Sequence, residues 1–78
     1  MNLREALLWI AETFEEPAEN IKPDTPRDAI AGWDSLGALT LMARLDEELD
    51  IILSDGDLAN MKAVGDILEV IKTHGCLE

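Results

Sequence analysis

The chain has 78 residues, of which 47% are hydrophobic, so it can form one small domain with an apolar core but not a second domain. Six Lys and Arg side chains stand against seventeen Asp and Glu, giving a net charge of −11 at pH 7. This charge repels phosphate backbones and anionic lipid surfaces, so we expect no nucleic acid and no membrane as partners. Basic protein surfaces are the favoured partners.

Features of targeting and redox chemistry are few. The single cysteine, Cys76, cannot form an internal disulfide. The first ten residues lack the basic start, long apolar run and cleavage site of a secretory signal, so the expected location is the cytoplasm. Leu77 and Glu78 could be a cloning remnant, and residues 1–76 are expected to form the single domain.

The N-terminal segment has the pattern of an amphipathic helix. Asn2 and Glu5 have the spacing of a capping box, with Asn2 as N-cap. Apolar residues then recur at helical spacing, at Leu3, Leu7, Ile10 and Phe14. A helix from about Leu3 to Glu15 is predicted, and Trp9 is expected in the core because Leu8 beside it broadens the apolar face.

Residues 16–33 are expected to form a long loop. They contain all three prolines of the chain and no apolar period, and the isolated Ile21 and Ile30 are expected to pin the loop to the core. A loop of this length in so small a domain is uncommon and usually functional. Trp33 ends the loop, and we expect it to be an anchor that is only partly buried.

A second helix is predicted over about Ser35 to Leu49. Its apolar face consists of Ala38, Leu41, Met42, Leu45 and Leu49. The following Ile51, Ile52 and Leu53 form a run that is too short for a sheet, and it is interpreted as a buried connector.

Two more helices are predicted in the last third of the chain. Ser54 and Asp57 fit the start of a short helix, expected over about Asp57 to Asn60. A stripe of Val64, Ile67, Leu68 and Ile71 predicts a helix from about Val64 to Thr73, ended by His74 and Gly75. The predicted fold is all-α: a small four-helix bundle with three longer helices, a short third helix and a long loop between the first two. The predicted interior comprises Phe14, Leu41, Met42, Leu45, Ile52, Leu58, Val64, Ile67, Leu68 and Ile71.

Ser35 falls at the N-terminus of the second predicted helix. The first N–H groups of a helix lack internal partners and carry partial positive charge, so an anion attached to Ser35 would be stabilised there. A phosphodiester on the hydroxyl fits this position. The alternative is that Asp34 or Ser35 is only an N-cap, a role that both residue types fill routinely.

Nearly the whole chain resembles the acyl carrier protein family. The resemblance rests on the amphipathic first helix, the Pro-rich loop, Gly-Trp-Asp-Ser-Leu at 32–36, the stretch 41–49 and the short third helix. It implies that 4′-phosphopantetheine is joined to Ser35 through a phosphodiester, with Asp34 and Leu36 beside it. It further implies a carrier without catalytic residues, which holds an acyl intermediate as a thioester for enzymes of fatty acid or specialised lipid or polyketide-type biosynthesis.

The resemblance also implies partner enzymes. They are a phosphopantetheinyl transferase and acyl-loading and acyl-processing enzymes with basic docking patches, and the carrier itself is expected to be a monomer. Residues 46–57 hold six acids and no base, which is either a solvated acidic face or a docking surface. The expected docking residues are Leu36, Gly37, Thr40, Arg44, Glu47, Glu48, Asp55 and Asp57.

Gly37 and Thr40 stand where carriers of fatty acid synthesis usually have acids, which favours a specialised carrier with its own partners. We expect Gly37 to allow the close approach of a partner or of the arm. The ten interior residues could also part to shelter an acyl chain, which would make them its lining.

Several alternatives stay open or are disfavoured by the residues. One is an aminoacyl or peptidyl carrier of a nonribosomal-peptide-type pathway, and another is an acidic helical interaction module without a prosthetic group. A hydrolase that uses Ser35 and His74 is disfavoured because no Gly-x-Ser-x-Gly motif is present. No metal site is expected, because the residues before Gly56 lack the oxygen ligands of an EF-hand and one Cys with one His is too few for zinc.

Overall fold

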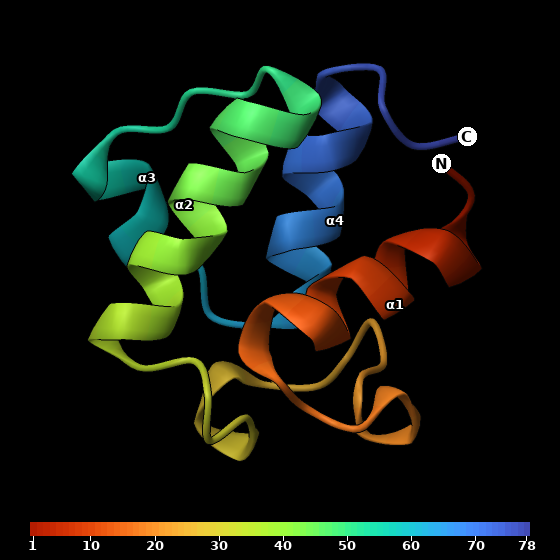
Figure 1. Cartoon of the computed structure of the whole chain (residues 1–78), viewed down its shortest axis with the longest axis vertical. Coiled ribbons are helices and arrows are strands. Elements are labelled where there is room, and N and C mark those ends of the chain that lie inside the picture. Colours follow the sequence, from red (N-terminus) through yellow and green to blue (C-terminus); the bar gives the residue numbers. More distant parts are fainter.

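Four α-helices and two short 3₁₀ helices make up the computed structural model, which describes residues 1–78 (Figure 1). In chain order they are α1 (Leu3–Phe14), η1 (Ala18–Asn20), η2 (Arg27–Ala29), α2 (Ser35–Leu49), α3 (Asp55–Ala59) and α4 (Val64–Thr73). The strand-like pairing is limited to an isolated bridge between Pro26 and Ala63. The predicted all-α fold, with three longer helices and a short third one, is confirmed. No helix combines the length and the apolar character needed to cross a bilayer.

The capping box that starts α1 is confirmed. The Asn2 side chain accepts a hydrogen bond from the Glu5 N–H at 2.8 Å, and the Glu5 carboxylate accepts one from the Asn2 N–H at 3.0 Å. The helix ends at Phe14, one residue before the predicted end, because Glu15 adopts a left-handed conformation with φ 53°. This turn directs the chain from the helix into the loop.

The bounds of α2 and α4 agree with the prediction, whereas α3 begins and ends earlier than expected. Ser54 is the N-cap: its Oγ accepts from the Asp57 N–H at 3.1 Å, and the Asp57 carboxylate accepts from the Ser54 N–H at 3.2 Å. The predicted capping pair is therefore present. The predicted range Asp57–Asn60 was wrong because a capped helix starts directly after its cap, here at Asp55.

Eighteen buried apolar residues form one core, to which the helices and the long loop contribute. Eight of the ten predicted interior residues belong to it, and Met42 packs at its edge. Ile52 does not: its side chain is 81% exposed. Because successive side chains of an extended segment point to opposite sides, Ile51 and Leu53 are buried and Ile52 faces outward, so a fully buried connector was the wrong interpretation.

The long loop is more ordered than its composition suggested. Ile21 and Ile30 are buried, as predicted. Each 3₁₀ helix runs from a proline to one of these isoleucines, η1 from Pro17 to Ile21 and η2 from Pro26 to Ile30. Backbone hydrogen bonds join the loop to the α3–α4 connection, with the Arg27 N–H donating to Lys62 O at 2.8 Å and the Val64 N–H donating to Thr25 O at 2.9 Å. The loop is thus fixed at both its isoleucines and its backbone.

The two chain ends lie side by side (Figure 1). The Met1 ammonium group donates to Cys76 O at 2.7 Å, and the Glu78 N–H donates to Met1 O at 2.8 Å. Leu77 packs partly against the core. These two C-terminal residues, set aside in the sequence-based domain, therefore contact the rest of the fold.

Candidate functional site

Ser35 is the first residue of α2, and its hydroxyl is exposed. The capping role belongs to Asp34, whose carboxylate accepts from the Gly37 N–H at 2.8 Å. The Asp34 carbonyl accepts from the Ala38 N–H at 2.8 Å and so begins the helical ladder. Ser35 is therefore not needed as a cap, and its hydroxyl makes no hydrogen bond within the chain.

The amide groups around Ser35 are suited to an anion. The N–H groups of Ser35 and Leu36 have no acceptor within the chain. They lie at the positive end of a 15-residue helix, where the partial charges of the peptide dipoles favour negative groups. An exposed, unbonded hydroxyl beside two open N–H groups fits the attachment of a phosphate ester.

Backbone contacts fix the start of α2 against the loop and α1. A Cβ atom on Gly32 would lie 2.0 Å from the carbonyl oxygen of Phe14, and one on Gly37 would lie 1.9 Å from the carbonyl oxygen of Gly32. Both positions therefore need glycine because another backbone occupies the space of a side chain. Gly37 is buried and its close neighbour is the chain's own loop, so its expected contact with a partner or with the arm stays a prediction.

The residue before the N-cap is held by an aromatic stack. Trp33 is 4% exposed, more buried than predicted, and its ring stacks on that of Phe14 with centroids 5.0 Å apart. The Arg27 guanidinium lies 5.4 Å from the centre of the Trp33 ring, and its Nε–H donates to Trp33 O at 3.3 Å. Trp33 thus anchors the end of the loop and fixes where α2 begins.

Arg44 joins α2 to α1. Its Nη1–H donates to Thr13 Oγ1 at 2.7 Å and to Trp9 O at 3.1 Å, while its Nε–H donates to the Glu48 carboxylate at 2.7 Å. The guanidinium also lies 4.6 Å from the centre of the Trp9 ring. With a side chain 22% exposed and these donors engaged, Arg44 links the two helices, and its expected role in docking partners stays a prediction.

The same cluster lowers the pKa of Glu48. The main cause is the hydrogen bond from Arg44, followed by the bond from Trp9 Nε1–H, which donates to Glu48 Oε1 at 3.1 Å. Both donors stabilise the ionised carboxylate. Glu48 was also predicted to dock partners, but its carboxylate is bonded to the chain's own side chains.

The other predicted docking residues are at the surface. Leu36 is 72% exposed and lies next to Ser35, and Thr40 and Glu47 follow it on the outward side of α2. Asp55 and Asp57 are exposed on α3, although the Asp57 carboxylate is used in the cap of that helix. An open groove of about 600 Å³ runs beside Asp34 and Leu36 between the end of α1 and the start of α2.

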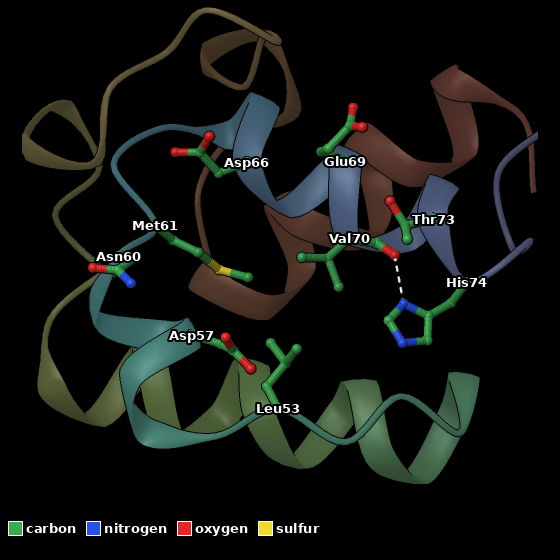
Figure 2. A pocket seen from close by; sticks show the side chains of 9 residues that line it. All are labelled: Leu53, Asp57, Asn60, Met61, Asp66, Glu69, Val70, Thr73 and His74. Atoms are coloured by element: carbon green, nitrogen blue, oxygen red, sulfur yellow. Dashed lines mark hydrogen bonds between the residues drawn. The ribbon is translucent and has the colours of Figure 1, made fainter.

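A second pocket lies between α3 and α4 (Figure 2). Ser35 is not among the residues that line it. Of its three acidic residues, Asp57, Asp66 and Glu69, the two aspartates accept capping hydrogen bonds. His74 Nδ1 bonds to Val70 O at 2.9 Å. His74 follows the C-terminal end of α4, at the opposite end of the bundle from the start of α2 (Figure 1). Ser35 and His74 are therefore not brought together, and no group of three potential metal ligands occurs in the chain.

Two features of the site were not predicted from the sequence. The first is the close contact between the carbonyl oxygen of Gly32 and α2 at Gly37. Its signal in the sequence was Gly37 itself. A glycine in the first turn of a helix costs about 1 kcal/mol relative to alanine, which favours a position where another backbone approaches closely. The second is the polar cluster around Arg44. The sequence carried no signal for it, because the burial of Thr13 beside Arg44 follows from the packing of α1 on α2.

Comparison with known proteins places the site in a family context. A family model described as the phosphopantetheine attachment site matches residues 8–71. An acyl carrier protein of Phytoplasma mali (strain AT) is 35% identical over 66 residues, which cover 85% of this chain and 79% of that protein. No solved structure was found to match. The loop, α2 and α3 all lie inside the matched range.

Proposed function

This chain belongs to the acyl carrier protein family and forms its phosphopantetheine attachment domain, and we propose on that basis that Ser35 carries 4′-phosphopantetheine through a phosphodiester. The supporting observation is the exposed hydroxyl of Ser35, left without a hydrogen bond because Asp34 fills the capping role. The arm would present an acyl intermediate to enzymes of fatty acid or of specialised lipid or polyketide-type biosynthesis.

The residues of the chain have a supporting role in this function. When bound, the prosthetic group supplies the thiol that holds the acyl group as a thioester. The N–H groups of Ser35 and Leu36 are available to phosphate oxygens, and Asp34 keeps the first turn of α2 in place. The carboxylate of Asp34 beside Ser35 is engaged in capping α2, and we expect the chain to be acted on by its partners and to catalyse no step itself.

The first partner of such a carrier is the phosphopantetheinyl transferase, and the others load and process the acyl group.

The interior of the molecule has no open cavity for an acyl chain. Leu41, Leu45 and Ile67 are fully buried, and the pockets of the molecule open at the surface. Shelter of an acyl chain in the core would therefore require α2 and its neighbours to move apart.

Intact-protein mass spectrometry tests the attachment site. The protein is incubated with coenzyme A and a promiscuous phosphopantetheinyl transferase that is active on a known carrier. We expect the mass of one phosphopantetheine to be added to the parent and to Ser54→Ala, which removes the other serine of the chain, but not to Ser35→Ala.

Each other outcome has a defined meaning. A gain of mass in Ser35→Ala would move the attachment to another residue. No gain in the folded parent would contradict the carrier function and favour an acidic helical interaction module without a prosthetic group. Far-ultraviolet circular dichroism verifies that each variant keeps the fold. We expect both to keep it, because even the loss of the Ser54 cap costs only about 1 kcal/mol.

A further inference from the structure

The groove between the end of α1 and the start of α2 opens beside Ser35. Its volume of about 600 Å³ is within the range of small-molecule sites in proteins. Both chain neighbours of Ser35, Asp34 and Leu36, line this groove, and neither lines another pocket of the molecule. A group attached to Ser35 therefore starts at the edge of the groove.

The length of the groove matches that of a pantetheine arm. Its lining on α2 runs from Asp34 to Arg44, and ten residues of helix rise about 15 Å. The arm has a backbone about as long as that of four residues, and an extended chain of that length spans about 14 Å. Gly32 and Gly37 also line the groove and contribute no side chain to fill it.

The open polar atoms of the groove are hydrogen-bond acceptors. The Asp34 carboxylate uses Oδ1 for the helix cap, which leaves Oδ2 open. The Thr40 hydroxyl donates to Leu36 O at 3.0 Å, so it can only accept a further bond. Glu12 Oε1 lies 4.0 Å from Arg44 Nη2, beyond hydrogen-bond distance. A ligand for this groove must therefore supply donors.

We propose that this groove holds the pantetheine arm of the chain itself, so that the arm lies along α2 on the side of α1. The inference rests on the proposed function, because it takes Ser35 as the attachment residue. The arm offers two amide N–H groups and a thiol as donors, and its methyl and methylene groups can pack against the exposed side chain of Leu36. Attachment at Ser35 gives the arm an effective concentration of about millimolar at the groove, so weak contacts suffice to hold it.

Isotope-filtered NMR tests the proposal on the full chain. The transferase loads the unlabelled protein from coenzyme A whose pantetheine part is isotope-labelled, and the gain of mass verifies the loading. We expect NOE cross-peaks from the arm to Thr40 and Glu15, which line the groove from α2 and from the end of α1.

Two tryptophan variants make a matched pair. Thr40→Trp places an indole ring in the groove and should abolish the cross-peaks between the arm and Glu15. Leu39→Trp adds the same ring at the neighbouring exposed position, which does not line the groove, and should keep these cross-peaks. Circular dichroism verifies the fold of both variants, and the loaded parent alone decides if one of them does not fold.

Three results would overturn the inference. They are a loaded parent whose arm gives no cross-peak to the end of α1, cross-peaks from the arm to α3 in their place, and cross-peaks to Glu15 that persist in folded Thr40→Trp. The mass of the parent separates these results from a failure of the proposed function. If the parent gains phosphopantetheine but lacks the cross-peaks, only the groove is refuted, whereas a parent that gains no mass refutes the carrier function as well.

Discussion

Replacing Gly37 with alanine tests the tightest backbone contact beneath Ser35. The new Cβ atom would lie 1.9 Å from Gly32 O and 3.3 Å from Cδ1 of Phe14, so the loop must move away from α2. At an open helical position the same change would stabilise the protein by about 1 kcal/mol. Overpacking costs about 1–3 kcal/mol, and the upper end applies because the nearest atom, the carbonyl oxygen of Gly32, is backbone and cannot rotate away. We therefore expect the free energy of unfolding to fall by about 2 kcal/mol.

Gly56 provides a matched control with the opposite expected sign. It lies in α3, and a Cβ atom there would meet only Ser54 Oγ, at an ordinary contact distance of 3.7 Å. Gly56→Ala should therefore stabilise the protein by about 0.4–1 kcal/mol. The assay is urea unfolding followed by circular dichroism, with Tm as a second measure at about 4–8 °C per kcal/mol for a domain of this size.

The sign of the change in the free energy of unfolding of Gly37→Ala shows whether the contact with Gly32 constrains the fold. If Gly37→Ala were as stable as the parent, or stabilised like Gly56→Ala, the backbone contact with Gly32 would not constrain this part of the molecule. Displacement of Gly32 also shifts Trp33 and Asp34, which precede Ser35 directly. We therefore expect slower phosphopantetheinylation of folded Gly37→Ala, measured by the rate of mass gain, and an unchanged rate would separate the glycine contact from the function of Ser35.

Three further predictions concern charge. Arg44→Ala should lower the free energy of unfolding by about 1–2 kcal/mol because bonds to α1 are lost, whereas Arg4→Ala, at an exposed position, should leave urea unfolding unchanged. Hydrogen bonds from Arg44 and Trp9 hold the pKa of Glu48 below its ordinary 4.5. The stability that these bonds give the folded protein is therefore fully present above pH 4.5, and it is lost as the pH falls through the lowered pKa. Unfolding of Glu48→Gln should therefore depend less on pH in this acid range, and an unchanged dependence would contradict the role of the carboxylate. The charge of −11 should make Tm rise with added salt at low ionic strength, and a salt-independent Tm would argue against self-repulsion.

The parts of the fold that depend on neighbouring residues were predictable from the sequence. The apolar periods gave the bounds of α2 and α4, and the pairs Asn2–Glu5 and Ser54–Asp57 are capping boxes as expected. The position of Ser35 at a helix start followed from the same local pattern. Each of these features is decided within about two helical turns of the chain, where side-chain spacing carries the information.

The features that the sequence did not reveal depend on segments far apart in the sequence. Arg44 is outside the apolar stripe of its helix, yet its hydrogen-bond partners Trp9 and Thr13 are 35 and 31 residues away. The close contact at Gly37 has the same cause, because its neighbour Gly32 is held in place by the packing of the loop on α1. Tertiary contacts override the local pattern at both positions, and they do so next to the candidate site.

The division of α2 into an inner and an outer side explains how one serine can serve several partners. Beneath Ser35, Gly37 and Trp33 hold the helix start against the loop and α1, so the attachment point is rigid. Outward, no side chain covers the hydroxyl, and the nearest large groups are Leu36 and Leu39. Under the proposed function, the surface around Ser35 is therefore rigid and the flexibility belongs to the prosthetic arm.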